Sequence, residues 1–364
     1  MTAPELRAWL VLLRTPATRL RLRAALDACG SAEAVLAESD RALARLGFDD
    51  EARRWLADPD AGLIESDLAW FEPPDRHLLT ADHPAWPPLL AEIPDPPLAL
   101  FVRGDPTLLA EPQLAIVGSR NPTPAGRETA ADFARHLAHA GLIITSGLAM
   151  GIDGASHKGA LDGGGATIAV CGTGLDRIYP ARHEALGHAI AAHGALVSEY
   201  PLGTRPLRHH FPERNRLVSG LSLGVLVVEA AQRSGSLISA RLASEQGREV
   251  FAIPGSIHNP LAHGCHRLIR DGAKLVETAA DVLEELAPLL RLATDAAEAN
   301  ATASPDDPES QQVLKYVDFA PTSVDCIVER SGLTAAAISA MLLSLELQGF
   351  IAAAPGGGYM RTSE

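Results

Sequence analysis

The stretch LAIVGSRNPTPAGRETAADFARHLAHAGLIITSGLAMGID, residues 114–153, decides the fold class of this chain. An apolar run ends in a glycine turn, a segment of helical period follows, and a second apolar run ends in a second glycine turn. This order predicts a βαβ unit with two parallel strands. Arg120 stands in the first turn, where the pyrophosphate of a dinucleotide would meet bare backbone. The turn therefore predicts an anion site that includes a positive charge.

The same alternation continues along the middle of the chain. Segments of helical period separate the apolar runs LAIVG, LIITSG, TIAVCG, ALVSEY, LGVLVVEA and EVFAIPG. Strands that are apolar on both faces and alternate with helices predict an α/β fold with a Rossmann-like, doubly wound, mostly parallel sheet. Ligands of such sheets bind at the carboxyl ends of the strands, and the glycines gather there.

Two further modules are expected beside this sheet. Residues 1–72 have helical spacing and predict a small all-helical domain, either a packing module or a hairpin-type DNA contact. In the proline-rich passage 83–106 we expect extended chain lying on the next domain, with LALFVRG as an edge strand. The α/β domain then covers residues 73–291, and a polar, acidic linker covers 292–308.

The last segment, residues 309–364, predicts a winged helix. Its expected recognition helix, Thr334 to Gln348, contains no Lys or Arg and one acid, Glu346. A helix that reads a DNA groove needs cations for its phosphate and guanine contacts. This domain is therefore expected to contact protein or to play an accessory role.

Charge is distributed unevenly over the 364 residues. The net charge of −14 argues against a nucleic-acid partner, but residues 201–274 contain ten Lys or Arg against five acids. An anion is therefore expected to bind the middle of the chain. Four cysteines without a CxxC pair favour a reducing cytoplasm. No apolar run approaches membrane-spanning length. The N-terminal apolar run precedes its arginines, which is the reverse of the order in a signal peptide.

Three turns contain residues suited to phosphate. Gly118, Ser119 and Arg120 follow the first strand, and a helix follows them. Ser146, Gly147 and Gly151 repeat the pattern in the second turn. Asp153 is expected to cap the helix that follows rather than to bind a metal together with His157. Lys158 either reaches a phosphate or is solvated. The third group is Arg214, Asn215 and Arg216, expected just before a helix, with the small-residue turn Ser234, Gly235 and Ser236.

So many anion sites along one sheet edge favour a polyanionic strand over a single nucleotide. No GxGxxG, GxxxxGK[ST], GxSxG or HExxH motif is present, which disfavours NAD, ATP and hydrolase chemistry. His258, His263, Cys265 and His266 match no common zinc spacing and are expected in a polar Gly/Pro loop. We therefore expect no enzyme, no cofactor and no metal.

Several ordered motifs lie between residues 113 and 277: IVGSR, SGLAMGID, GTGLDRIYP, SEYP, FPERNRLVSGLS, VVEAAQRSGSLISA, VFAIPG and LIRDGAKLV. Together they resemble the DNA-processing protein A (DprA/Smf) family of natural transformation. The resemblance extends to a sterile-alpha-motif-like domain before these motifs and a DprA-type winged helix after them. It implies a non-enzymatic protein that binds single-stranded DNA, forms homodimers through the Rossmann-like domain and loads the recombinase RecA onto incoming strands.

Residue by residue, the resemblance places phosphates at Gly118, Ser119 and Arg120, with Ser146, Gly147 and Ser234 to Ser236 in the same pocket. Arg214 would assist, and Arg182 would supply the basic residue that follows the YP motif. Relatives carry Thr-Asn where this chain has Cys265-His266, a loop variation.

Two alternatives stay open. A nucleotide hydrolase of the lysine-decarboxylase-like group resembles this sheet edge, but its PGGxGTxxE motif corresponds to VVEAAQRSGS here, which lacks the helix-borne Glu. A scaffold with incidental DNA affinity, which would use its acidic flanks for protein partners, is the third reading.

Overall fold

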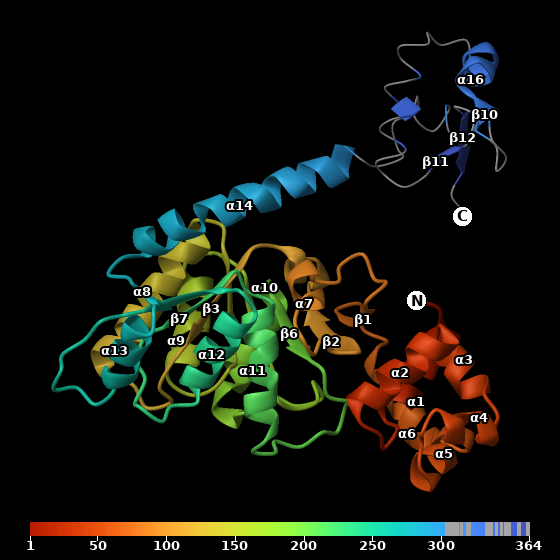
Figure 1. The fold of residues 1–364 in the computed structure, drawn as a ribbon. Helices are drawn as coiled ribbons and strands as arrows, with labels where there is room; N and C mark the ends of the chain where they lie inside the picture. The colour runs from red at the N-terminus through yellow and green to blue at the C-terminus, as the bar shows by residue number, and fades with distance from the viewer. Residues whose placement is uncertain are drawn as a thin grey trace. The chain divides into compact units, whose positions relative to one another are not determined.

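The structure is a computed structural model. It describes residues 1–302 and, beyond them, 313, 316–317, 322–331, 338, 341–342, 345, 351–354 and 358–361. The chain forms two compact units, Met1–Ala287 and Pro288–Glu364. Figure 1 shows the elements of both.

Six short helices begin the first unit, as predicted: α1 Ala3–Leu13, α2 Arg19–Cys29, α3 Ala32–Ala37, α4 Asp40–Arg45, α5 Asp50–Ala57 and α6 Ala61–Trp70. Each begins after a Thr, Ser or Asp whose side chain accepts an amide of the first turn. Such caps satisfy amides that have no partner within the helix. Local sequence therefore sets where these helices start.

A nine-stranded sheet follows, in the order β1-β2-β6-β5-β4-β3-β7-β8-β9. The six predicted strands are β3 Gln113–Val117, β4 Ile143–Ser146, β5 Thr167–Val170, β6 Ala195–Ser198, β7 Gly224–Val227 and β8 Glu249–Ala252. They pair in parallel, and β9 Lys274–Leu275 joins β8 in the same direction. The prediction of a Rossmann-like, mostly parallel sheet is confirmed.

One strand prediction is wrong in its position. The proline-rich passage supplies β2, Ala99–Gly104, but β2 is not at the edge, because it pairs antiparallel with β6 on one side and β1 on the other. The edge strand is β1, Arg76–Thr80, which the sequence reasoning missed. Leu100 and Val102 face one core and Phe101 the other, so β2 is covered on both faces.

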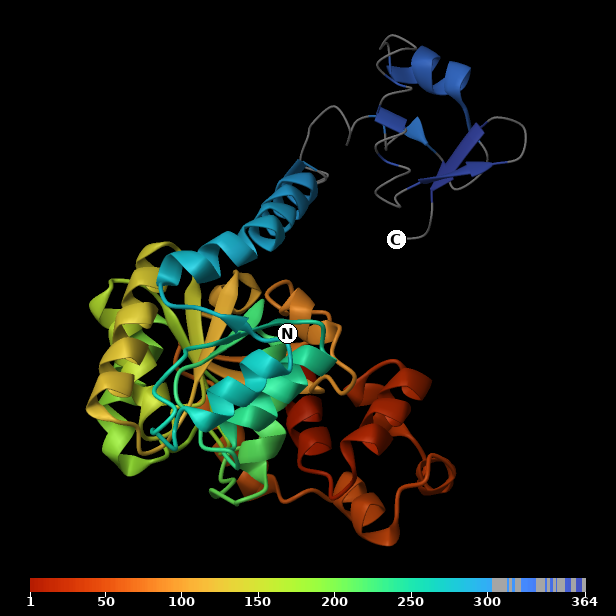
Figure 2. The ribbon, with the colours of Figure 1, turned by 60° about the vertical axis from the view of Figure 1, so that its left-hand side comes forward.

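Helices cover both faces of the sheet (Figures 1 and 2). On one face lie α8 Pro124–His139, α9 Ile152–Asp162 and α10 Glu184–His193, and on the other α11 His210–Gly220, α12 Ser236–Glu245 and α13 His263–Arg270. Shorter pieces are α7 Pro88–Ala91 and the 3₁₀ helices η1 Pro106–Ala110 and η2 Ala181–His183. Strand order reverses between β3 and β7, and ligands of doubly wound sheets bind outside that point.

The second unit contains a three-stranded antiparallel sheet, β10 Thr322–Ser323, β12 Gly358–Arg361 and β11 Ile351–Ala354, and the helix α16 Val324–Ser331. Helix α14, Ala279–Thr302, extends through the first part of the predicted linker 292–308. The expected recognition helix, residues 334–348, lies mostly outside the described residues. The division into 1–72, 73–291, 292–308 and 309–364 stays a prediction. Within the described part of the chain, no helix has the length and apolarity needed to cross a bilayer.

Candidate nucleic-acid interface

A cavity of about 490 Å³ opens at the carboxyl ends of β3 and β7, where the strand order reverses. Its lining comes from the turn after β3, the start of α9, the first turns of α11 and the start of α12. Three arginines and one carboxylate line it: Arg120, Arg214, Arg233 and Asp153. A larger hollow of about 840 Å³, between α12, β8 and α13, adjoins this cavity through Arg233, Ser234, Gly235 and Ile238 but is lined by no residue of the turn after β3.

The turn after β3 is held tightly by its neighbours. A Cβ on Gly118 would meet the Ile152 side chain at 2.6 Å and the Glu229 carbonyl at 3.0 Å, so only glycine fits. The Ser119 amide donates to the Glu229 carbonyl at 2.7 Å and is not free for a ligand. The Ser119 hydroxyl accepts the Asn121 amide at 3.1 Å, which leaves its own hydrogen for an acceptor in the cavity. Gly118 and Ser119 both line the cavity, and their contact with phosphate stays a prediction.

Arg120 is exposed at the rim of this cavity. Its guanidinium carbon lies 5.7 Å from the centre of the Phe211 ring, and it forms no ion pair with any residue that the structure describes. An arginine stacked on an aromatic ring is held in one orientation while its donors stay available. The centre of the Phe211 ring is in turn 5.6 Å from that of the Tyr179 ring, so Phe211 lies close to both Arg120 and a second aromatic side chain.

The second turn supports the cavity from behind. The Ser146 hydroxyl is fully buried and donates to the Ile116 carbonyl at 2.7 Å, so it joins β4 to β3 and does not reach the cavity. Gly147 makes room for the Arg214 guanidinium, which a Cβ would strike. Neither residue lines the cavity, and the structure does not support the predicted phosphate contact of Ser146.

Asp153 does not cap α9, contrary to our expectation. The residue before this helix is Gly151, at φ 89°, and it receives no side-chain cap. Asp153 lies within the helix, accepts the Ala149 amide at 3.2 Å and lines the cavity. Burial raises the pKa of its carboxyl, and the charge of Arg214 opposes this rise.

Arg214 and Arg216 lie within α11, not before it. Arg214 is 3 % exposed, donates to the Val170 carbonyl and forms part of the floor of the cavity. Burial lowers the pKa of its guanidinium, and the charge of Asp153 opposes this effect. Asn215 also lines the cavity, whereas Arg216 is bound to Glu199 elsewhere.

The SGS turn closes the remaining side. Gly235 precedes α12, and the Ser234 and Ser236 hydroxyls lie 2.8 Å apart. All three residues line the cavity, and their contact with phosphate stays a prediction. Because the N-terminal amides of a helix attract anions, this turn adds to the positive field of the arginines.

The sequence matches known protein families and individual relatives. The family model described as DNA recombination-mediator protein A matches residues 77–287, and the DprA winged helix domain matches residues 297–357. The chain is 48 % identical to Protein Smf of Escherichia coli over 316 residues, 85 % of this chain and 84 % of that protein. It is 47 % identical to DNA processing protein DprA of Bacillus subtilis over 205 residues, 56 % and 68 % of the two chains.

This chain belongs to the DNA recombination-mediator protein A family.

Solved structures agree with this assignment to the DNA recombination-mediator protein A family. The crystal structure of DprA from Streptococcus pneumoniae is 37 % identical, covers 77 % of this chain and 97 % of that chain, and superposes with a TM-score of 0.69. DNA processing protein A from Helicobacter pylori, described for its single-stranded DNA binding mode, is 33 % identical over 58 % of this chain and 96 % of that chain, with a TM-score of 0.53. The winged-helix assignment is confirmed by the family match.

Besides Ser146 and Gly147, two more predicted site residues lie outside the cavity of this family member. Lys158 is exposed on α9 and Arg182 is exposed on η2, and neither is part of the lining. His157, also on α9, bonds to the Thr167 hydroxyl at 2.7 Å, and burial lowers its pKa to about 3. Contact of Lys158 or Arg182 with DNA stays a prediction.

Three of the four residues of the His/Cys group lie on a helix and not in a loop, and His258 lies in the turn before it. His263, Cys265 and His266 lie on α13, and the two histidines face the carbonyls of Ile257 and Gly255. Cys265 is buried, which raises its pKa to about 11. Within the described part of the chain, no three His, Cys, Asp or Glu residues are grouped as a metal site.

Three residues at or beside the candidate site were missed from the sequence of this recombination mediator. Phe211 and Arg233 line the cavity. Glu229 is 7 % exposed and accepts both the amide and the hydroxyl of Thr123, the residue before α8, at 2.8 and 2.7 Å. Glu229 follows β7 by two residues, at the same edge as the predicted turns, and this position was the available signal.

Proposed function

We propose that this protein is a recombination mediator that binds single-stranded DNA, protects incoming strands during DNA uptake and loads the recombinase RecA onto them. It would act in the cytoplasm, as a homodimer formed through the Rossmann-like domain, and without catalytic turnover. The family is that of a DNA recombination mediator, and the Helicobacter pylori relative is described as binding single-stranded DNA.

The single observation that supports this proposal is the composition of the switch-point cavity. Three arginines and one carboxylate line it, and Arg120 lies over the Phe211 ring and forms no ion pair with any residue that the structure describes. Single-stranded nucleic acid is held by cations that contact phosphates and by aromatic rings on which bases stack. Both groups lie at one edge of this sheet.

A gel shift that compares single with double strands tests the proposal. The protein should retain an oligothymidine at lower concentration than a duplex of equal length, and adding RecA should produce a ternary complex on the single strand. Equal retention of both DNA forms would contradict the proposal.

Absence of turnover has its own test. Incubation with a panel of nucleoside monophosphates should release no base at an enzymatic rate. Release would favour the nucleotide hydrolase reading of the sheet edge.

A further inference from the structure

Glu199 lies directly after β6 and is bound by arginines from two parts of the first unit. Its side chain is 7 % exposed, and its Oε2 accepts from Arg19 at the start of α2 and from Arg216 on α11. Asp95, in the connection between α7 and β2, pairs with Arg19 at 2.8 Å and lies 3.5 Å from the Arg216 Nε. Two arginines and two carboxylates therefore join the helical module to α11.

A second arginine of the helical module holds the connection between β6 and α11, the segment that contains Glu199. Arg14 donates to the Leu202 carbonyl at 2.8 Å, and Asp67 of α6 fixes its guanidinium through two hydrogen bonds. Arg14 is 14 % exposed and Asp67 4 %. The chain that leaves β6 is thus bound to the helical module at positions 199 and 202.

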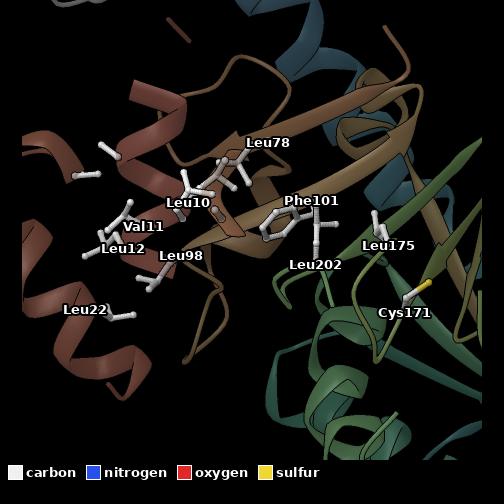
Figure 3. Close-up of a cluster of buried hydrophobic side chains, with 14 of the residues drawn as sticks. Leu10, Val11, Leu12, Leu22, Leu78, Leu98, Phe101, Cys171, Leu175 and Leu202 are labelled. Atoms are coloured by element: carbon white, nitrogen blue, oxygen red, sulfur yellow. The ribbon is translucent and has the colours of Figure 1, made fainter. Parts of the chain in front are cut away.

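Apolar packing makes this junction continuous. A single cluster of buried side chains contains Leu10 and Leu12 of α1, Phe101 of β2 and Leu202 of the connection. Figure 3 shows these side chains between the N-terminal helices and the strands. Buried, interlocked side chains transmit displacement, because a packed core has no space to absorb it.

The same connection leads to the cavity. It enters α11, on which Arg216 faces Glu199. Phe211 and Arg214 of the same helix face the cavity. The Tyr200 hydroxyl donates toward the His210 carbonyl at 3.3 Å, and the two rings stack with centres 4.1 Å apart. Tyr200 therefore holds the start of the helix that supplies Phe211 and Arg214, and Glu199 holds its middle through Arg216.

We infer that Glu199 is a positioning residue for the DNA-contacting side of α11, and that the N-terminal helical module sets the affinity for single-stranded DNA by holding Glu199 through Arg19. This inference rests on the proposed function. Arg19 has a role only through the ion network, since the cavity lining does not include it. Burial raises the pKa of Glu199 to about 7, and Arg19 opposes this rise, so losing Arg19 weakens the hold on a carboxylate that is unfavourable to bury.

The test measures binding of a labelled oligothymidine of about 20 nucleotides to the full chain at several salt concentrations. Arg19→Ala should weaken binding about threefold to tenfold, the range expected when a coupling residue without ligand contact is removed. The dependence of affinity on salt should keep its slope, because no phosphate contact is lost. Arg19→Lys should recover most of the affinity by keeping a cation beside Glu199.

Arg7→Ala is the matched control. Arg7 lies in the same module and pairs with Glu65, but both side chains are exposed, at 44 % and 64 %. This variant should bind DNA as the wild type does. Glu199→Gln, combined with Arg19→Ala, should add little to the single change, since both act through one network.

The outcomes separate the two proposals. Wild-type protein that fails to bind oligothymidine overturns the proposed function. If the wild type binds and Arg19→Ala lowers the unfolding temperature without changing affinity, the positioning inference is wrong. A flatter salt dependence in Arg19→Ala would also overturn it, because Arg19 would then contact phosphate directly.

Discussion

Replacing Arg120 with alanine tests the cavity most directly. Of the three lining arginines, Arg120 and Arg233 are exposed, while Arg214 is buried beside Asp153. If each of the three arginines neutralises one phosphate, the slope of log affinity against log salt should be about −2.1, at roughly −0.7 per phosphate of a single strand. Without Arg120 the slope should become about −1.4.

These slopes give measurable differences. Between 50 and 200 mM salt, wild-type affinity should fall roughly 18-fold, and Arg120→Ala affinity roughly 7-fold. At low salt the variant should also bind about 10- to 150-fold more weakly, since a hydrogen bond to a charged group contributes about 1.5–3 kcal/mol. Because Arg120 is exposed, the variant should fold with a nearly unchanged unfolding temperature.

Fluorescence anisotropy with a labelled oligothymidine measures both quantities. Arg241→Ala is a suitable control, because Arg241 is 66 % exposed on α12, pairs with Glu245 and does not line this cavity. Arg120→Lys should keep the wild-type slope but bind more weakly, since lysine lacks the planar guanidinium that stacks and donates twice. Identical slopes and affinities for wild type and Arg120→Ala would refute the assignment of DNA to this cavity.

Three further predictions concern stability and domain roles. Glu229→Gln places an amide against the Thr123 donors and should lower stability by about 1–3 kcal/mol, measured as a reduced thermal midpoint; an unchanged midpoint would show that this contact is dispensable. The pKa of His157 is about 3 in the folded protein and about 6.5 in the unfolded chain, so the stability contributed by its neutral form is complete above pH 6.5 and is lost as pH falls toward 3. At pH 5 the free energy of unfolding should therefore be lower by about 2 kcal/mol, and His157→Gln should remove that part of the acid sensitivity when unfolding by denaturant is measured at several pH values. The same pH dependence of stability in wild type and variant would contradict this prediction. Removing residues 292–364 should leave oligothymidine binding undiminished, and a large loss would assign DNA contact to the winged helix.

Much of the fold was predictable because local pattern determines local structure. Apolar runs of β3 to β8 and the glycine turns after them specify parallel strands with a ligand edge, and capping side chains specify helix starts. The edge position given to β2 was wrong because prolines before a strand indicate how the chain enters it, not which strands lie beside it. Pairing of distant segments is decided by the whole sheet.

The candidate site shows the same division. The sequence by itself determined that Gly118, Ser119 and Arg120 lie at the carboxyl end of a strand, since the glycine turn directly follows the apolar run. Only the tertiary structure decided the directions of the side chains around them. Arg214 and Arg216 are two residues apart on a helix, roughly 200° around its axis, so one faces the cavity and the other faces Glu199. Direction follows from how a helix packs on its neighbours, and that packing depends on residues far away along the chain.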